Sequence, residues 1–306
     1  MKLTRREMVK LGLGTAALSA LGPLPELLAQ EPLITKPIPS SGERIPVVGL
    51  GTRDYEAETP ELRAELKEVL RRFPELGGKV IDSASGYRDG ASETLIGELV
   101  SELGNRDRLF LATKVNASGR QAGIAQIERS FQRMRTNRLD LIAVHNLRDT
   151  LTQLENLREF KQAGRIRYLG ITTSSEGQYD EFETFMKTQT LDFVQVDYAV
   201  DNRLAADRLL PLAADRGMAV MVNLPFGRGR LFAAVRNQSM PDWAQEIDCT
   251  TWAQIFLKYI VSHPSVTCAI PGTRSVAHLL DNIQGAQGRL PDAAMRRRME
   301  QYIDQL

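Results

Sequence analysis

The chain has 306 residues, of which 39 are basic and 38 are acidic, so its formal net charge is +1. This balance argues against a nucleic-acid partner or an anionic membrane surface, because both attract an excess of one charge. Hydrophobic residues make up 42% of the chain, which is enough for a large globular core. The length suits two ordinary domains or one α/β barrel.

Residues 1–29 have the organisation of an export signal. Basic residues open the chain, a segment rich in Gly, Ala and Leu follows, and small residues end it near Ala29. The apolar segment is too short and too interrupted for a stable membrane span, so we expect no stable membrane anchor. No cysteine directly follows it, which argues against a lipoprotein. A frayed basic tail followed by a surface helix is the alternative interpretation.

The stretch TRREMVK, from Thr4 to Lys10, resembles the twin-arginine pattern of proteins that are exported already folded. This pattern predicts the twin-arginine export machinery as a partner, cleavage near Ala29, and a periplasmic or otherwise exported location. Residues 30–45 are predicted to be a linker and a short lid hairpin. Residues 46–306 are predicted to form one folded domain.

Short runs rich in Val, Ile, Leu and Phe alternate with longer segments whose apolar residues fall at helical spacing. The eight runs are VVGLGT from Val47, VIDSA from Val80, LFLATKV from Leu109, LDLIAVH from Leu139, YLGITT from Tyr168, FVQVDYA from Phe193, MAVMVNLPF from Met218 and TCAIPGT from Thr267. Strands separated by helices pair in parallel through right-handed crossovers, and eight such units close a barrel. We therefore predict a single-domain (β/α)8 TIM barrel. A doubly wound open sheet is the alternative, but its glycine-rich turn after the first strand is missing here.

Polar side chains follow three consecutive predicted strands. Asp82 and Tyr87 follow the second, Lys114 ends the third and His145 ends the fourth. Active sites of such barrels lie at the carboxyl ends of the strands, so we expect these four groups at one rim. Taken singly, each has a structural explanation in capping, packing or solvation. Their joint placement favours a catalytic set.

The four groups can act together, with Tyr87 as the proton donor and the other three in supporting roles. The usual phenol pKa of about 10 is too high for an efficient acid, but a neighbouring ammonium lowers it by favouring the phenolate. Lys114 can supply that charge, and Asp82 can keep the lysine charged. His145 can donate a hydrogen bond to a substrate oxygen. The set predicts protonation of a carbonyl oxygen by Tyr87 as hydride reaches the carbonyl carbon.

In order and strand placement, DSASGY, ATK and AVH resemble the Asp-Tyr-Lys-His tetrad of the aldo-keto reductases. The resemblance extends from about Val47 to Asn282. It implies an oxidoreductase that reduces an aldehyde or ketone to an alcohol, or the reverse, with a nicotinamide cofactor. NADP is favoured, with NAD as the alternative. We expect a small-molecule carbonyl substrate and an open, tolerant pocket.

Further motifs resemble the cofactor site of that family. The strand end GLGT resembles the part that approaches the nicotinamide, PFGRGRL the loop around the pyrophosphate, and IPGTRSVAHLLDNI the segment that grips the adenosine half. The residues that the resemblance assigns to the cofactor are Gly51, Thr52, Asp82, Thr172, Thr173, Gln195, Asn223, Pro225, Gly227, Gly229, Leu231, Gly272, Thr273, Arg274, His278, Asp281 and Asn282. Among them, Gln195 matches the glutamine that hydrogen-bonds the carboxamide.

The residues around Arg274 also favour a phosphate on physical grounds. A helix is predicted to begin near Ser275, and free backbone N–H groups, the helix dipole and the Arg274 guanidinium all attract an anion. Some positions depart from the family pattern. Thr172 and Thr173 replace a frequent Ser-Asn pair, and Asn223 replaces an aromatic residue. His278 stands where many NADP-dependent members have an arginine that binds the 2′-phosphate. Arg274 can compensate for the absence of that arginine.

Two other classes of function remain for comparison. One is a non-catalytic cofactor-binding barrel that acts as a sensor or partner subunit, and the intact tetrad argues against it. The other is a hydrolytic or metal-dependent barrel, and the lack of a His, Asp and Glu ligand cluster in the sequence argues against it. We expect no metal site, and no disulfide between Cys249 and Cys268. The sequence does not indicate an oligomeric state.

Overall fold

Eight parallel strands form the centre of the computed structural model, which describes residues 31–306. In the order in which they pair, they are β3 (Leu50–Gly51), β4 (Val80–Asp82), β5 (Phe110–Val115), β6 (Leu139–Val144), β7 (Ile166–Thr172), β8 (Phe193–Asp197), β9 (Ala219–Asn223) and β10 (Cys268–Ala269). Parallel bridges from Val48 to Ala269 and from Gly51 to Gly272 join the first strand to the last. The predicted α/β fold with one curled parallel sheet is confirmed, and these bridges close the sheet as a barrel requires.

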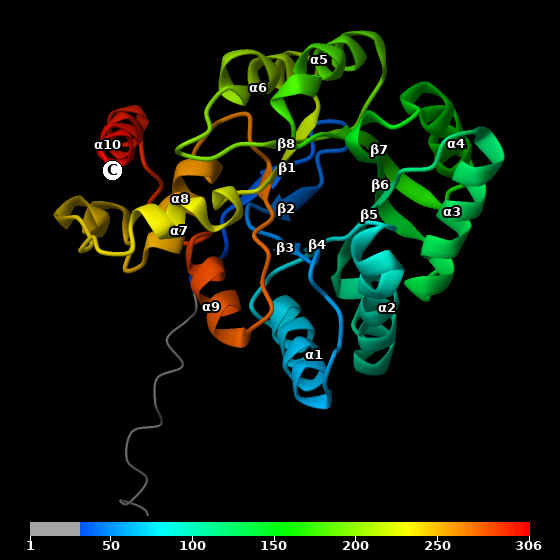
Figure 1. The fold of residues 1–306 in the computed structure, drawn as a ribbon, viewed down its shortest axis with the longest axis horizontal. Coiled ribbons are helices and arrows are strands. Elements are labelled where there is room, and N and C mark those ends of the chain that lie inside the picture. The colour runs from blue at the N-terminus through cyan, green and yellow to red at the C-terminus, as the bar shows by residue number, and fades with distance from the viewer. Residues whose placement is uncertain (1–30) are drawn as a thin grey trace, which may run out of the picture. The chain divides into compact units, whose positions relative to one another are not determined.

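The helices lie around the outside of the strands (Figure 1). They are α1 (Pro60–Glu75), α2 (Ala91–Leu103), α3 (Arg120–Arg133), α4 (Thr150–Gln162), α5 (Tyr179–Thr188), α6 (Ala205–Asp215), α7 (Arg230–Ala234), α8 (Trp252–Val261), α9 (Val276–Gln284) and α10 (Ala293–Asp304). In α1, Leu66, Val69, Leu70 and Phe73 are buried. This spacing of three and four residues turns one apolar stripe toward the strands.

Apolar side chains from the barrel strands, with Ile38 and Ile45, form a separate inner core. The other strand members of this cluster are Val80, Phe110, Ala112, Leu141, Tyr168, Phe193, Ala219, Met221 and Cys268. The ring centres of Phe110 and Tyr168 lie 5.9 Å apart, and those of Tyr168 and Phe193 lie 5.4 Å apart. Since several of these residues begin their strands, they fill the amino end of the barrel. The carboxyl end is left for the site.

A hairpin of β1 (Thr35–Pro37) and β2 (Arg44–Pro46) packs on this amino end. Ile38 and Ile45 are fully buried in the inner core. The Lys36 ammonium donates to the carbonyls of Val261, His263 and Val266 at 2.8, 2.8 and 2.7 Å. The hairpin therefore covers the end of the barrel opposite to the carboxyl rim. The predicted export signal in residues 1–29 lies outside the described residues.

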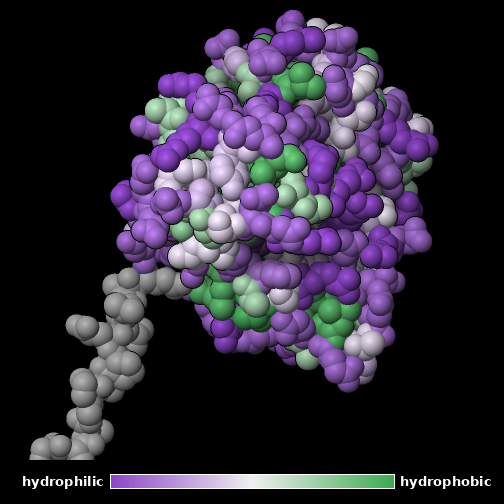
Figure 2. All heavy atoms as spheres, turned by 60° about the vertical axis from the view of Figure 1, so that its left-hand side comes forward, coloured by the Kyte–Doolittle hydropathy of each residue, from purple (hydrophilic) through white to green (hydrophobic). Residues whose placement is uncertain are grey.

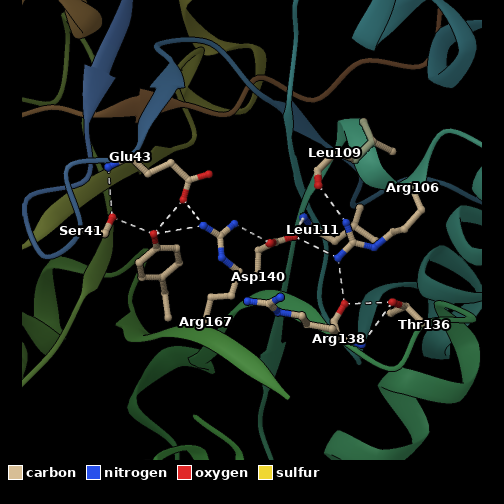
Figure 3. Close-up of polar contacts among 10 residues, drawn as sticks. Ser41, Glu43, Arg106, Leu109, Leu111, Thr136, Arg138, Asp140 and Arg167 are labelled. Carbon is tan, nitrogen blue, oxygen red and sulfur yellow. Dashed lines mark hydrogen bonds and ion pairs between the residues drawn. The ribbon is translucent and has the colours of Figure 1, made fainter. Parts of the chain in front are cut away.

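A polar network joins the hairpin to the strands at the amino end (Figure 3). Asp140, which is 5% exposed, accepts hydrogen bonds from the Leu111 N–H at 2.8 Å, from Arg106 at 3.1 Å and from Arg167 at 2.9 Å. Arg167 also donates to Glu43 of the hairpin. Because both carboxylate oxygens of Asp140 accept hydrogen bonds from within the fold, we assign it a structural role.

Replacing Asp140 by Ala should lower the free energy of unfolding by about 3 kcal/mol, because two guanidinium groups and a buried amide lose their shared acceptor. Urea unfolding followed by circular dichroism measures the change. Asp107→Ala is the matched control, since Asp107 is exposed at the same end and a surface change of this kind is worth within about 0.5 kcal/mol. Equal stability of the two variants would contradict the assigned role.

The outer surface is mixed in character. Figure 2 shows a face that is mainly hydrophilic, with small and separate apolar areas. In the described part of the chain, four large apolar side chains are well exposed, namely Leu151, Leu204, Phe232 and Leu306. Within residues 31–306, none of the helices has the length and apolar character needed to cross a bilayer.

Candidate active site

The carboxyl ends of β4, β5 and β6 bring the four predicted catalytic side chains together. The Lys114 ammonium on β5 donates to Asp82 Oδ2 on β4 at 2.6 Å and to the Ser83 carbonyl at 2.7 Å. The same nitrogen lies 5.1 Å from the centre of the Tyr87 ring. The Tyr87 and His145 rings face each other edge to face, with centres 6.0 Å apart. A phenol, an ammonium and an imidazole thus share one small volume.

Burial and neighbouring charges together determine the charge states of Lys114 and His145. Burial alone would lower the pKa of Lys114, but Asp82 and then Tyr87 outweigh this effect and hold that pKa above its ordinary value. The lysine is therefore charged at neutral pH. Burial, and next the charge of Lys114, lower the pKa of His145 to about 3. Its imidazole is therefore neutral at pH 7 and can donate one hydrogen bond without holding a charge.

The loops that carry this cluster contain unusual backbone conformations. The two residues after Tyr87 have φ angles of 50° and 53°, and the two residues after His145 have φ angles of 51° and 55°. Leu224, directly after Asn223, has a φ of 50°. Residues other than glycine rarely adopt this left-handed backbone conformation, and each one costs about 1–3 kcal/mol of folding free energy. Strain of this kind gathers at functional sites, which supports this rim as the active site.

Two adjoining hollows open at the rim, with volumes of about 500 and 630 Å³. The residues that line both are Arg53, Asp54, Tyr87, Asn223, Leu224 and Arg228. The smaller hollow also contacts His145 and Asn146, and the larger one runs from Gly51 toward Arg274. We refer to the smaller as the substrate hollow and to the larger as the cofactor cleft. Tyr87 lies where the two meet.

Most residues that the sequence assigns to the cofactor face one of these hollows. Thr172 and Gln195 line the substrate hollow, and Asn223 lines both. The cofactor cleft is lined by Gly51, Thr52, Asp82, Pro225, Gly229, Gly272, Thr273, Arg274 and His278. Gly51 sits so close to β10 that an added Cβ would lie 3.0 Å from the Ile270 carbonyl oxygen. The lack of a side chain at Gly51 thus allows a close approach of the two backbones where this strand end meets the cleft.

The remaining assigned residues line neither hollow. Thr173 donates to Gln178 at 2.7 Å, and Asp281 accepts from Gln254 at 2.7 Å. Asn282 donates to Thr273 Oγ1 at 2.7 Å and so positions a residue that does line the cleft. Leu231 packs in the outer core, and Gly227 lines a small side hollow next to the site. These residues shape the loops of the cleft.

The start of α9 differs from the sequence expectation. Its N–H groups were expected to be free for a phosphate, but the Val276 N–H donates to Glu65 of α1 at 2.8 Å. The His278 N–H donates to the capping hydroxyl of Ser275 at 3.3 Å. Arg274 has no hydrogen-bond or ion-pair partner in the part of the chain that the structure describes. Its guanidinium is therefore the group at this end that is available to hold a phosphate.

The cleft fits a nicotinamide dinucleotide. Asn223 donates through Nδ2 to the Thr173 carbonyl at 2.9 Å, while its Oδ1 is buried and has no partner among residues 31–306. An unpaired buried acceptor is costly, and the amide N–H2 of a carboxamide would satisfy it. The Tyr55 hydroxyl also lines the cleft and lacks a partner. These two atoms and the Arg274 guanidinium match the amide and phosphate groups of such a cofactor.

Sequence reasoning gave no role to Arg53 and Tyr55, which follow β3 and line the cofactor cleft. Tyr55 is fully buried, and nothing in the sequence distinguished it from a packing residue. Their place directly after a strand was the available signal, because that is the rule that found Asp82 and Lys114. No group of three or more His, Cys, Asp or Glu side chains within residues 31–306 is arranged to hold a metal ion.

Comparison with known proteins agrees with this site. The sequence model of the Aldo/keto reductase family matches residues 47–302. The methylglyoxal reductase YeaE of Escherichia coli (strain K12) is 30% identical over 270 residues, which cover 85% of this chain and 92% of that protein. A Klebsiella pneumoniae aldo/keto reductase, solved in complex with NADP and acetate, is 25% identical with a TM-score of 0.70, covering 86% of this chain and 93% of that one.

A further Klebsiella pneumoniae aldo-keto reductase, solved in complex with NADPH, has the same fold, with a TM-score of 0.72 and 24% identity. The alignment covers 89% of this chain and 96% of that one. The family match spans every strand of the barrel and every residue of the tetrad. The chain belongs to the aldo/keto reductase family.

Proposed function

We propose that this protein is an NADP-dependent carbonyl reductase, which converts an aldehyde or ketone to an alcohol or runs the reverse reaction. The observation that carries the proposal is the buried Lys114–Asp82 pair beneath Tyr87 and His145, at the point where the two hollows meet. Family membership supports the same chemistry. The NADP bound by the Klebsiella pneumoniae relative supports the choice of cofactor.

A bound nicotinamide supplies the hydride, and this chain supplies the proton and the orientation. The Tyr87 hydroxyl and the neutral His145 ring can both donate to the substrate's carbonyl oxygen. As the carbonyl carbon is reduced, the Tyr87 proton moves to that oxygen. The Lys114 ammonium beside the ring stabilises the phenolate that remains. Asp82 holds the ammonium in place through the 2.6 Å contact.

The function is tested with purified protein, NADPH or NADH, and a panel of aldehydes and ketones. We expect nicotinamide absorbance to fall only when a carbonyl compound is present, and faster with NADPH. Tight NADPH binding without turnover of any carbonyl compound would instead identify the non-catalytic sensor. Faster reaction with NADH would contradict the cofactor choice.

Replacing Arg274 by Ala should weaken NADPH binding by about 1.5–3 kcal/mol and leave NADH binding little changed, because only NADPH carries a 2′-phosphate for the unpaired guanidinium. Fluorescence titration of both reduced cofactors measures the two affinities. Arg129→Ala is a matched control, since Arg129 is exposed on α3 and outside the cleft. Equal losses for the two cofactors would place Arg274 on the shared pyrophosphate.

We also propose that the protein is exported by the twin-arginine route, on the sequence of residues 4–10 and the apolar run after them. This route carries folded proteins, so the barrel can take up its cofactor before export. No pool of NADPH is expected outside the inner membrane, where a dissociable cofactor would be lost by mass action. The cofactor would then act as a prosthetic group, recycled by alternating reduction and oxidation of two substrates.

Arg5→Lys combined with Arg6→Lys should retain the protein in the cytoplasm, because the export machinery reads the arginine pair. Cell fractionation with immunodetection measures the distribution. The unmodified protein, recovered from the periplasm, should begin after a cleavage near Ala29 and contain bound nicotinamide cofactor. Folded but cofactor-free protein in that compartment would contradict the prosthetic-group proposal, and unchanged export of the lysine variant would contradict the route.

A further inference from the structure

The substrate hollow is lined by three guanidinium groups, from Arg53, Arg88 and Arg228. Arg88 is neutralised, because it lies 2.8 Å from Asp54 and 3.7 Å from Glu56. The side chains of Arg53 and Arg228 form no hydrogen bond or ion pair with any other residue of the described chain. Two positive charges at the mouth of the site are therefore uncompensated.

No other described residue that lines this hollow offsets those charges. Asp54 is the one carboxylate among the lining residues, and it already pairs with Arg88. His145 is neutral at pH 7 because its pKa lies near 3. Asp82, in the adjoining cleft, is balanced by Lys114. The excess positive charge favours a ligand that brings its own negative charge.

The rest of the lining is also unsuited to an apolar substrate. Besides the arginines, the described residues that line it are mainly polar, such as Asn146, Ser174 and Gln195, and Leu224 is the only aliphatic side chain among them. Pockets for apolar ligands are lined mainly by hydrophobic and aromatic side chains with few polar groups. This hollow has the opposite composition, which suits a small polar or charged carbonyl compound.

The backbone holds Arg53 beside the tetrad. The N–H and the hydroxyl of Thr52 both donate to the Asp82 carbonyl, at 3.1 and 2.9 Å. The Tyr55 N–H closes a turn onto the Thr52 carbonyl at 3.0 Å, so Arg53 lies within a fixed turn. Both Arg53 and Arg228 line the cofactor cleft as well. Arg228 lies between Gly227 and Gly229, in the loop that the sequence assigns to the pyrophosphate. We therefore assign Arg228 to the cofactor's phosphates and Arg53, held beside Asp82, to the substrate.

We infer that the preferred substrate is a carbonyl compound with an oxyanion group, a carboxylate or a phosphate, which binds to Arg53. This inference rests on the proposed carbonyl reduction at the same site. A guanidinium binds a carboxylate or phosphate through two parallel charge-assisted hydrogen bonds, which fix orientation as well as adding affinity. Bound in this way, the anion would hold the substrate with its carbonyl group toward Tyr87 and His145.

The test compares related carbonyl substrates with and without an anionic group, at saturating NADPH. One pair is 4-formylbenzoate and its methyl ester, and the other is glyceraldehyde 3-phosphate and glyceraldehyde. The unmodified protein should favour the anionic member of at least one pair by about 10-fold or more in kcat/KM. The pair with the larger ratio identifies carboxylate or phosphate as the preferred group.

Arg53→Gln should bring that ratio close to one, and Arg53→Lys should retain part of it, because the lysine keeps the charge but not the planar fork. Arg129→Gln is the matched control on the outer face of the barrel, where the same loss of charge should leave the ratio unchanged. A ratio near one in the unmodified protein would overturn the inference. So would a ratio that survives Arg53→Gln, or a loss of NADPH affinity in that variant as large as the loss in the ratio.

A separate measurement distinguishes failure of the proposed carbonyl reduction from failure of the anion site. If no carbonyl compound is turned over, the anion site is measured by adding benzoate or its neutral counterpart benzamide to the NADPH complex and following nicotinamide fluorescence. Benzoate binding that exceeds benzamide binding, and that Arg53→Gln abolishes, would support the anion site without the reaction. Equal or undetectable binding of both would overturn it.

Discussion

Tyr87→Phe should reduce the kcat for carbonyl reduction by at least about 10²-fold while NADPH binds with nearly the parent affinity. The change removes the only proton that the proposed mechanism gives to the carbonyl oxygen. It keeps the aromatic ring, and with it the edge-to-face contact with His145. Steady-state kinetics with the best carbonyl substrate, together with fluorescence titration of NADPH, separates the two effects.

The control for this variant is Tyr302→Phe, which removes a hydroxyl from α10, where the ring packs against Trp243 and Trp252. It should leave both kcat and NADPH affinity unchanged. Turnover near the parent value in Tyr87→Phe would reject Tyr87 as the proton donor. Because the ring is retained, a loss of activity there cannot be assigned to a cavity in the core.

Lys114→Met should have two large effects. It removes the charge that stabilises the Tyr87 phenolate, so turnover should fall by at least about 10²-fold. It also leaves Asp82, which is 4% exposed, as a buried carboxylate without its partner. Breaking such a pair on one side costs about 3–5 kcal/mol of folding free energy. Kinetics and urea unfolding measure the two losses independently.

The double variant Asp82→Asn with Lys114→Met separates these effects. Its buried charges are both gone, so much of the stability lost in the single lysine variant should return, as expected for contacting residues that are strongly coupled. Turnover should stay low, because the phenolate still lacks its ammonium. Recovery of turnover in the double variant would show that the Lys114 charge has no catalytic role.

The strands and the tetrad were open to prediction because both depend on local pattern. Strands buried on both faces are continuous apolar runs, such as the one that begins at Met218. Polar groups directly after such runs fall at the carboxyl rim, which located Asp82, Lys114 and His145. The family prediction is confirmed by the match over residues 47–302. The export signal stays a prediction, because it depends on residues 1–29.

The cofactor cleft was less open to prediction, because hydrogen bonds between distant segments decide which polar groups remain free. Glu65 accepts a hydrogen bond from the Val276 N–H, 211 residues away in the sequence, and no sequence pattern predicts this contact. Thr173 and Asp281 were assigned to the cofactor by resemblance, yet their side chains already have partners within the chain. Asn223 keeps an unpaired oxygen that only the packed structure reveals.

The sequence by itself determined the order of strands and helices and indicated the candidate reacting groups, since the period of apolar residues and the chemistry of single side chains are local properties. Only the tertiary structure decided which charges are balanced and which are not. Arg53 and Arg88 look alike in the sequence, but Asp54 and Glu56 are close enough to neutralise Arg88 and leave Arg53 without a partner. Electrostatic interaction depends on distance in space and on burial, which become defined when the barrel closes.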